Sequence, residues 1–247
     1  MTDRNKALLL GCGAALAMAT SAQAVIVNLL SSPSSGTING ALFETTNVRP
    51  TGTGFIDPFL RIQANNVEQG YNTSGRPVRF DEKTDGNFTH DLQLSSLASR
   101  TINGTAYYEF MIDINEAGGG QELISLERLM FFTNPTGSIN PTDITQLGTL
   151  RYDMDAGDAT NTVRYNDGNS GSGQGDIRFF IPVANFAGAG INDFVYMFAR
   201  FGDTDNSDAG FEEFVAVRGT PPEIIPLPTA AGLAMAGLGG LAVRRRR

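Results

Sequence analysis

A loop rich in carboxylates is the part of this sequence whose residue types and spacing could do chemistry. Four acidic side chains fall within ten residues: Asp203, Asp205, Asp208 and Glu212. Calcium binds six to eight oxygen ligands in proteins, commonly from Asp at alternate positions with a later Glu. The spacing is not that of an EF-hand, because Asp208 stands where that loop needs glycine and Phe214 where it needs glutamate. The loop therefore indicates either a looser calcium site or a solvated acidic turn.

A second acidic stretch has similar spacing, with carboxylates at Asp153, Asp155 and Asp158. If the two loops lie at the same end of the fold, they could supply one shared calcium site. Calcium is the only cofactor that these residues suggest, and a solvated acidic turn is again the alternative.

Enzyme signatures are mostly missing. The sequence contains no G-x-S-x-G motif, no H-E-x-x-H motif and no phosphate-binding glycine loop. His90 is the only histidine, and its polar neighbours predict a surface position. Glu109 and Asp113 would share one strand face but lie about 13 Å apart by strand rise, too far for the paired carboxyl groups of a glycosidase. We therefore predict a non-enzymatic protein, with a secreted hydrolase as one alternative.

Four tyrosines could form a platform on which sugar rings stack: Tyr71, Tyr107, Tyr152 and Tyr165. Aromatic side chains on strands are more often core residues or cross-strand pairs. The sequence also has no tryptophan, which would be the strongest stacking surface. A calcium-dependent carbohydrate-binding module stays as the main alternative function, with exopolysaccharide as its ligand.

The elements that must position these residues are short strands joined by turns. Glycine and polar turn residues are interspersed with apolar and aromatic runs, and no long amphipathic helix is evident. The pattern predicts an all-β fold, an antiparallel β-sandwich of jelly-roll type. The strands are expected at 25–30, 41–46, 59–63, 92–97, 99–102, 105–115, 150–154, 162–166, 177–183, 194–201 and 214–217, with a linker at 31–40.

Three local patterns are more specific. Asn103-Gly104 favours a type I′ turn and predicts a hairpin, whose second arm places Tyr108 and Phe110 on one face. Segment 121–133 is compatible with a helix or a strand. The continuous apolar run 194–201 predicts a strand in the interior of the sheet.

The N-terminal segment 1–24 has the pattern of a secretory signal peptide. Ala22 and Ala24 supply the small residues at positions −3 and −1 of a cleavage site after Ala24. The expected partners are the Sec translocon and signal peptidase. The rival interpretation is a lipoprotein signal ending at Cys12, but only five residues separate Lys6 from it, too few for the apolar region.

The C-terminus carries a short apolar segment with basic residues behind it. Residues 227–243 contain no charged side chain, and these 17 residues would extend about 26 Å as a transmembrane helix, at the short limit for a membrane span. Basic residues beside a span stay on the cytoplasmic side; here they are Arg244, Arg245, Arg246 and Arg247. Prolines favour the start of the helix. A short membrane anchor follows from these residues alone.

A proline motif stands directly before this segment, formed by Ile225, Pro226, Leu227 and Pro228 and followed by Thr229. The order of motif, short span and terminal arginines resembles the PEP-CTERM sorting signal in its V-P-L-P-A variant, with Ile for Val and Thr for Ala. The resemblance implies that an exosortase recognises the tail, cuts near the prolines and releases or relocates the body. It further implies a Gram-negative bacterium and a link to exopolysaccharide or biofilm matrix. An uncut tail anchor is the alternative.

The body also resembles a recurrent subgroup of PEP-CTERM ectodomains. The resemblance supports export and a surface location, and it implies no chemistry. It rests on the segments 51–63, 68–73, 80–85, 153–157 and 210–214.

The charge balance excludes one class of partner. The signal segment 1–24 and the arginines 244–247 together contain six of the 18 Lys and Arg residues but only one of the 26 Asp and Glu residues, so the rest of the chain is more acidic than the whole at −8. An acidic surface does not suit nucleic acid. The prediction is thus a signal peptide at 1–24, a β-sandwich ectodomain at 25–220 and a sorting signal at 221–247, in an exported protein of the cell surface or extracellular matrix.

Overall fold

The computed structural model describes residues 23–46, 58–116, 123–157, 159–166, 175–208 and 210–217. These residues form β-strands and three short 3-10 helices, η1 (Leu94–Ser96), η2 (Ile144–Leu147) and η3 (Val183–Phe186). Within this part of the chain, no helix is long and apolar enough to cross a membrane. The predicted sorting motif 225–229, the apolar segment 227–243 and the terminal arginines lie outside the described residues.

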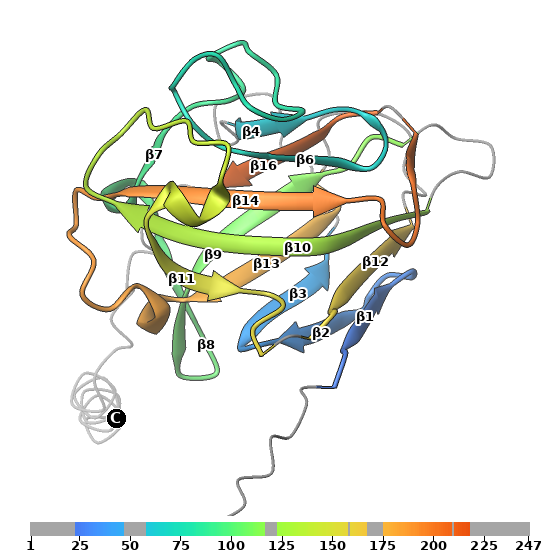
Figure 1. Cartoon of the computed structure of the whole chain (residues 1–247). Coiled ribbons are helices and arrows are strands. Elements are labelled where there is room, and N and C mark those ends of the chain that lie inside the picture. Colours follow the sequence, from blue (N-terminus) through green and yellow to red (C-terminus); the bar gives the residue numbers. More distant parts are fainter. Residues whose placement is uncertain are drawn as a thin grey trace, which may run out of the picture.

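The first sheet contains seven strands and has β10 (Leu123–Asn134) at its centre. Its order is β1 (Ile26–Leu29), β12 (Thr162–Asn166), β10, β14 (Phe194–Phe201) and β6 (Glu68–Tyr71), with β11 (Thr149–Asp153) paired to β10 and β7 (Leu92–Gln93) paired to β14. The β1–β12 pair is parallel, and the other pairs are antiparallel. Figure 1 shows this sheet in front, with β10 and β14 side by side.

The second sheet also contains seven strands and lies behind the first in Figure 1. Its order is β2 (Ser35–Ile38), β3 (Ala41–Thr45), β13 (Ile177–Pro182), β9 (Thr105–Asp113), β16 (Glu212–Ala216) and β4 (Pro58–Ile62), with β8 (Ser99–Ile102) paired to β9. A third, two-stranded sheet pairs β15 (Ser207–Asp208) with β5 (Asn65–Asn66). The all-β, mostly antiparallel class predicted from the sequence is confirmed.

Phenylalanine rings from both large sheets meet in the main core. Phe110 of β9 lies 5.0 Å from Phe131 of β10 and 5.3 Å from Phe179 of β13, measured between ring centroids. All three side chains are completely buried. Because burial of aromatic area is a large favourable term in folding, the Phe110–Phe131 contact joins the two large sheets in one core.

The predicted hairpin is confirmed and has a counterpart that the sequence interpretation missed. Asn103 and Gly104 have φ values of 48° and 84°, as a type I′ turn requires, between β8 and β9. Asn39 and Gly40 have the same two values between β2 and β3. The segment 31–40 therefore contains a strand and the start of a hairpin, and its interpretation as a linker was wrong.

Strand pairing between distant segments tests the two other local predictions, for segments 121–133 and 194–201. In the ambiguous segment 121–133, the described residues 123–133 belong to strand β10, which pairs with β14, β12 and β11 along its length. Strand β14 lies between β10 and β6, so the prediction of an interior strand for 194–201 is confirmed.

Candidate functional site

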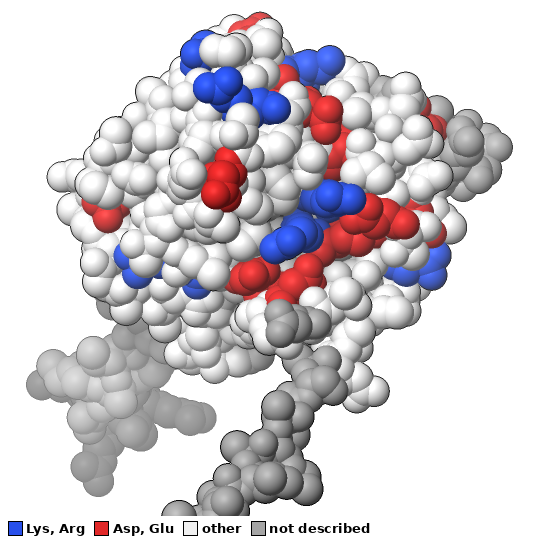
Figure 2. All heavy atoms as spheres, viewed as in Figure 1, with Lys and Arg blue, Asp and Glu red and all other residues white. Residues whose placement is uncertain are grey.

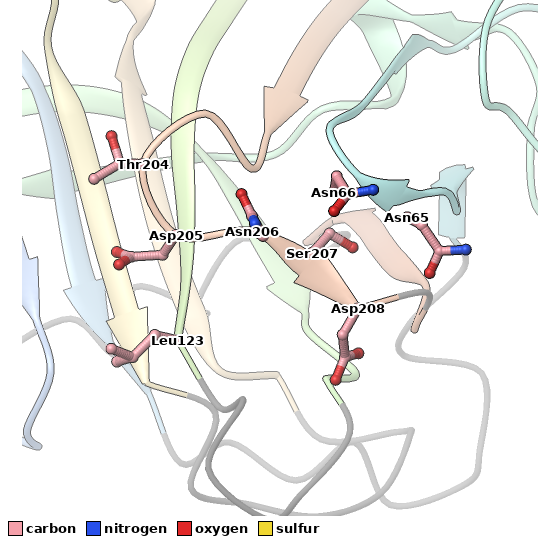
Figure 3. Close-up of a pocket in the computed structure, with 8 residues that line it drawn as sticks. All are labelled: Asn65, Asn66, Leu123, Thr204, Asp205, Asn206, Ser207 and Asp208. Atoms are coloured by element: carbon pink, nitrogen blue, oxygen red, sulfur yellow. The ribbon is translucent and has the colours of Figure 1, made fainter.

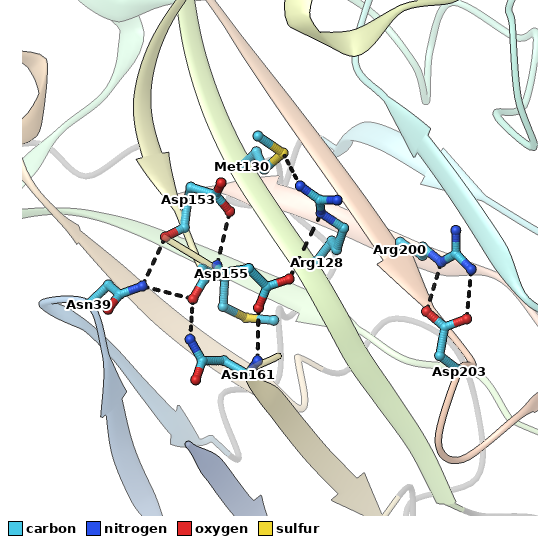
Figure 4. A network of polar contacts seen from close by, with 9 residues as sticks. Asn39, Arg128, Met130, Asp153, Asp155, Asn161, Arg200 and Asp203 are labelled. Atoms are coloured by element: carbon cyan, nitrogen blue, oxygen red, sulfur yellow. Dashed lines mark hydrogen bonds and ion pairs between the residues drawn. The ribbon is translucent and has the colours of Figure 1, made fainter. Parts of the chain in front are cut away.

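The acidic loop between β14 and β16 divides into two parts with different surroundings. In the first part, each carboxylate faces an arginine. Asp203 accepts hydrogen bonds from Arg200 at 2.7 and 2.8 Å, and Asp205 accepts from Arg164 at 2.6 and 2.8 Å. Figure 4 shows the two hydrogen bonds of the Arg200–Asp203 pair, whose side chains are partly exposed. These two carboxylates are thus occupied by ion pairs.

The second acidic stretch, after β11, is held by its own hydrogen bonds. Asp153 accepts from the backbone N–H of Asp155, and Asp155 accepts from the backbone N–H of Asn161. Burial raises the pKa of Asp155, while the Asn161 hydrogen bond and Arg128, 3.9 Å away, act in the opposite direction (Figure 4). Asp158 lies outside the described residues.

The structure does not bring the two predicted calcium loops together into one site. Asp153 pairs with Met130 of β10, whereas Asp205 bonds through its backbone N–H to Ser125 of the same strand. Those two positions on β10 are about 17 Å apart at the usual rise of a strand.

The later part of the first loop belongs to a group of four acidic side chains, which we call the carboxylate cluster: Glu68, Glu116, Asp208 and Glu212. Glu212 contacts the carboxyl groups of Glu68 and Glu116, and Glu116 contacts that of Asp208. Glu68 and Glu212 are completely buried, and Glu116 is 8% exposed. Three members of the cluster are thus buried, and Glu68 and Glu116 come from segments far in sequence from the loop that carries Asp208 and Glu212.

Sheet pairing fixes the positions of Glu68 and Glu212 in the cluster. Glu68 is the first residue of β6 and lies opposite Phe201 of β14, and Glu212 is the first residue of β16 and lies opposite Ile62 of β4. Gly210 allows the intervening loop to pass directly against the segment that follows β9, because a Cβ atom there would lie 1.3 Å from the carbonyl oxygen of Asn115. The absence of a side chain at Gly210 therefore lets the loop bring Glu212 close to Glu116.

Hydrogen bonds satisfy only part of the cluster. The backbone N–H of Ala64 donates to Glu68 Oε2, and that of Asp208 donates to Glu116 Oε2, each at 2.9 Å. Neither oxygen of Glu212 has a hydrogen-bond partner among the described residues, and neither does Glu68 Oε1. Buried carboxylate oxygens without a donor are rare in native proteins, and each one is costly.

Burial dominates the electrostatics of the cluster. It raises the pKa of Glu116 to about 8 and that of Glu212 well above its ordinary value, and contacts with neighbouring carboxyl groups add to both shifts. Burial also raises the pKa of Glu68, against the hydrogen bonds that it accepts. Within the described part of the chain, no basic side chain acts on Glu68 or Glu212.

The cluster is not a finished metal site. In the part of the chain that the structure describes, no three His, Cys, Asp or Glu side chains are grouped as ready ligands of one ion. The oxygens of the cluster are acidic and hard, and they are the kind that Ca²⁺ prefers. Of the seven residues predicted for calcium, only Asp208 and Glu212 belong to it.

Sequence reasoning missed Glu68 and Glu116, although a signal for Glu116 was present. Phe110, Ile112 and Ile114 alternate inward along β9 and its continuation, and Glu116 is the next inward position. Glu212 likewise precedes Phe214 and Ala216 on the inward face of β16. An acidic residue that continues a core-facing alternation predicts a buried charge.

A polar pocket of about 710 Å³ lies beside the cluster and shares Asp208 with it. Its lining carries amide, hydroxyl and carboxylate groups with one apolar side chain, as Figure 3 shows. The lining residues are Asn65, Asn66, Leu123, Thr204, Asp205, Asn206, Ser207 and Asp208. These groups suit a ligand with many hydroxyl groups better than an apolar one.

The tyrosine platform considered for sugar stacking does not form. Tyr71, Tyr152 and Tyr165 are at most 5% exposed, so their rings belong to the interior. Only Tyr107 is half-buried, and it packs at the edge of Phe180. These tyrosines therefore offer no stacking surface for a sugar, whereas the polar groups that line the pocket could form hydrogen bonds with one.

The carboxylate pairs offer no arrangement typical of a glycosidase. Glu68 and Glu212 touch each other and are closed to solvent, whereas such enzymes hold two carboxyl groups about 5 to 9.5 Å apart beside an open cleft. Glu109 forms an ion pair with Arg178 at 2.9 Å. His90, half-buried rather than fully exposed, has Nδ1 2.8 Å from the carbonyl oxygen of Asp91.

The surface charges of the described residues are interspersed. On the face shown in Figure 2, acidic and basic groups lie next to each other, and no large basic patch is visible.

Comparison with protein-family models, curated proteins and solved structures found no match.

Proposed function

We propose that this chain is an exported, non-enzymatic protein of the cell surface or extracellular matrix of a Gram-negative bacterium, sorted by an exosortase. The observation that carries the proposal is the order of the C-terminal segments: the proline motif 225–229, the short apolar segment 227–243 and the terminal arginines. Cytoplasmic basic residues at both ends of the chain would leave the body across the membrane. We further propose that the body is a β-sandwich of jelly-roll type.

The start of the folded body supports this reading of the N-terminus. The backbone N–H of Val25 donates to Asn161 Oδ1 at 2.7 Å, and β1 begins at the next residue. Ala24, directly before it, is exposed. Cleavage after Ala24 would leave a body that begins at its first anchored residue.

A sorting experiment in an exosortase-containing host tests the proposal. Pro226→Ala/Pro228→Ala changes the motif, and Pro221→Ala/Pro222→Ala is the matched control just outside it. We expect the wild-type and control proteins at the surface or in the medium, and the motif variant retained in the inner membrane. Equal distribution of all three proteins, or no effect of deleting the exosortase, would contradict the proposal.

The second candidate function is binding of exopolysaccharide, favoured by the pocket beside the carboxylate cluster. Its side-chain amides and hydroxyls can donate to and accept from sugar hydroxyl groups. Asn206 and Thr204 are exposed at its rim. This function is compatible with the first, because a sorted matrix protein has to contact the matrix.

A further inference from the structure

The same four residues, threonine, isoleucine, asparagine and glycine, stand in order at 37–40 and again at 101–104. Each copy carries the turn of a hairpin, and the two asparagines both have φ of 48° and the two glycines φ of 84°. Any cost that the turn conformation imposes on a reaction is therefore similar at the two sites, and a difference in reactivity has to come from their surroundings. We propose that Asn103 is a site of spontaneous deamidation, whereas tertiary contacts protect Asn39 from it.

The reaction uses only the asparagine, the glycine that follows it and water. The backbone nitrogen of the glycine attacks the side-chain amide carbon and closes a succinimide ring, and the amide nitrogen leaves as ammonia with the proton of that N–H group. Water then adds to one of the two ring carbonyls and opens the ring to aspartate or to isoaspartate. Glycine favours the attack, because it has no side chain to shield its nitrogen and its backbone is the least restricted.

The side-chain amide of Asn39 is held by carbonyl groups of the other large sheet, at the end of β11. Its Nδ2 donates to the carbonyl oxygen of Met154 at 2.8 Å and to that of Asp153 at 3.1 Å, as Figure 4 shows. The turn is also packed, because a Cβ atom on Gly40 would lie 3.7 Å from Pro182 Cγ. The amide has to give up both hydrogen bonds before it can turn toward the Gly40 nitrogen, so we expect Asn39 to react slowly.

The side chain of Asn103 has no such anchor. Among the described residues, no hydrogen bond holds its amide, and both Asn103 and Gly104 are exposed. No heavy atom lies within 4 Å of the position that a Cβ atom on Gly104 would take. In Figure 1 the turn between β8 and β9 projects from the lower edge of the body. The amide can therefore rotate toward the Gly104 nitrogen, and water reaches both groups.

The products would change the hairpin locally. Either product adds a negative charge, and isoaspartate also adds one carbon to the main chain inside a two-residue turn whose geometry matches the twist of its strands. Strand β8 pairs only with β9, whereas β9 is also paired with β13 and β16. We therefore expect β8 to loosen while the rest of the second sheet keeps its pairing. The inference does not rest on the proposed sorting or on polysaccharide binding.

Peptide mapping of the aged protein tests the inference. The full chain in mild detergent is incubated at pH 8, and samples are digested at acidic pH and analysed by mass spectrometry, which detects the exchange of an amide group for a hydroxyl. We expect Asn103 to convert about tenfold faster than Asn39 or more, because Asn39 must first lose two hydrogen bonds. Isoaspartate and aspartate peptides should both appear at position 103. Equal rates, or a faster reaction at Asn39, would overturn the proposal.

The unfolded chain is the matched control. In guanidinium chloride both asparagines keep the same neighbours on either side but lose their tertiary contacts, so their rates should become similar. If Asn103 stays the faster site by the same factor, the more distant flanking residues set the difference, and the assignment to tertiary contacts is overturned. In the folded protein, Asn39→Gln should leave the rate at Asn103 unchanged, whereas Gly104→Ala should slow it, because a side chain then shields the attacking nitrogen. An unchanged rate in Gly104→Ala would contradict the succinimide route.

Discussion

The carboxyl group of Glu212 contacts that of Glu68, although both side chains are completely buried. The two residues open β16 and β6, which belong to different sheets. The contact therefore depends on how the sheets stack and makes the cluster a polar site within an otherwise apolar interior.

The protein should lose stability as the pH rises from weakly acidic to weakly basic, because burial raises the pKa of Glu116. A carboxyl group whose folded-state pKa exceeds its ordinary value of 4.5 stabilises the folded state fully below that pH, and this stability is lost as the pH rises through the folded-state pKa. For Glu116 the window runs from 4.5 to about 8. Thermal melts in EDTA between pH 5 and pH 8 should show the decline, and Glu116→Gln should make it shallower. A thermal unfolding midpoint that rises between pH 5 and pH 8 would contradict a raised pKa for Glu116.

Asp205→Ala should destabilise the protein, because it removes an ion pair with Arg164. Its ion pair with Arg164 is partly exposed, with 30% of the arginine side chain and 12% of the aspartate side chain accessible, so we expect only a small loss in the free energy of unfolding. Asp203→Ala removes a more exposed pair and should cost less. Urea unfolding measures both effects. A larger loss for Asp203→Ala than for Asp205→Ala would contradict this ranking of the two ion pairs.

Gly104→Ala should cost about 1 kcal/mol, because residue 104 has φ of 84° in the β8–β9 turn and a side chain is strained there. Gly86→Ala is a suitable control, because nothing lies within 4 Å of an added Cβ and its φ is outside the left-handed region. We expect the control to change the free energy of unfolding by less than about 0.5 kcal/mol. Equal effects in urea unfolding would show that the turn does not impose the conformation.

Asn206→Ala should weaken retention on exopolysaccharide from the producing organism, because it removes an exposed amide from the pocket. One hydrogen bond to a neutral group corresponds to about 1 kcal/mol, or roughly a fivefold loss of affinity. Asn192→Ala is the control, since Asn192 is also exposed but precedes β14 whereas the pocket follows it. Affinity electrophoresis in gels containing the polysaccharide compares them. Equal mobility shifts for both variants would exclude this pocket as the binding site.

Local signals were sufficient for much of the fold. Asn103-Gly104 specified its turn because only a few residue types tolerate positive φ. Asn39-Gly40 carries the same signal, but the surrounding Ser, Pro and Gly residues were taken as a linker. Segment 121–133 could not be decided locally, because Leu123, Leu126 and Met130 fit a helix. Its pairing with β14, about 70 residues later, makes it a strand.

The candidate site was only partly predictable for the same reason. Asp208 and Glu212 were found from their spacing within one loop. Glu68 and Glu116 join them through sheet pairing and stacking between segments far apart in the sequence. The Arg200–Asp203 pair is local and could have been foreseen, whereas Arg164 reaches Asp205 only because β12 and β10 pair. The sequence pattern does not reveal which distant strands pair, or in which register, and this pairing brings the residues of the site together.

The intact mass of the protein recovered from the medium and the envelope of its native host tests the central claim most directly. The account predicts a mass that begins at Val25 and ends near Pro226, and that depends on the exosortase. A mass that runs through Arg247 in every fraction would contradict it. The tail would then be an uncut anchor, and the function would have to be sought at the inner membrane.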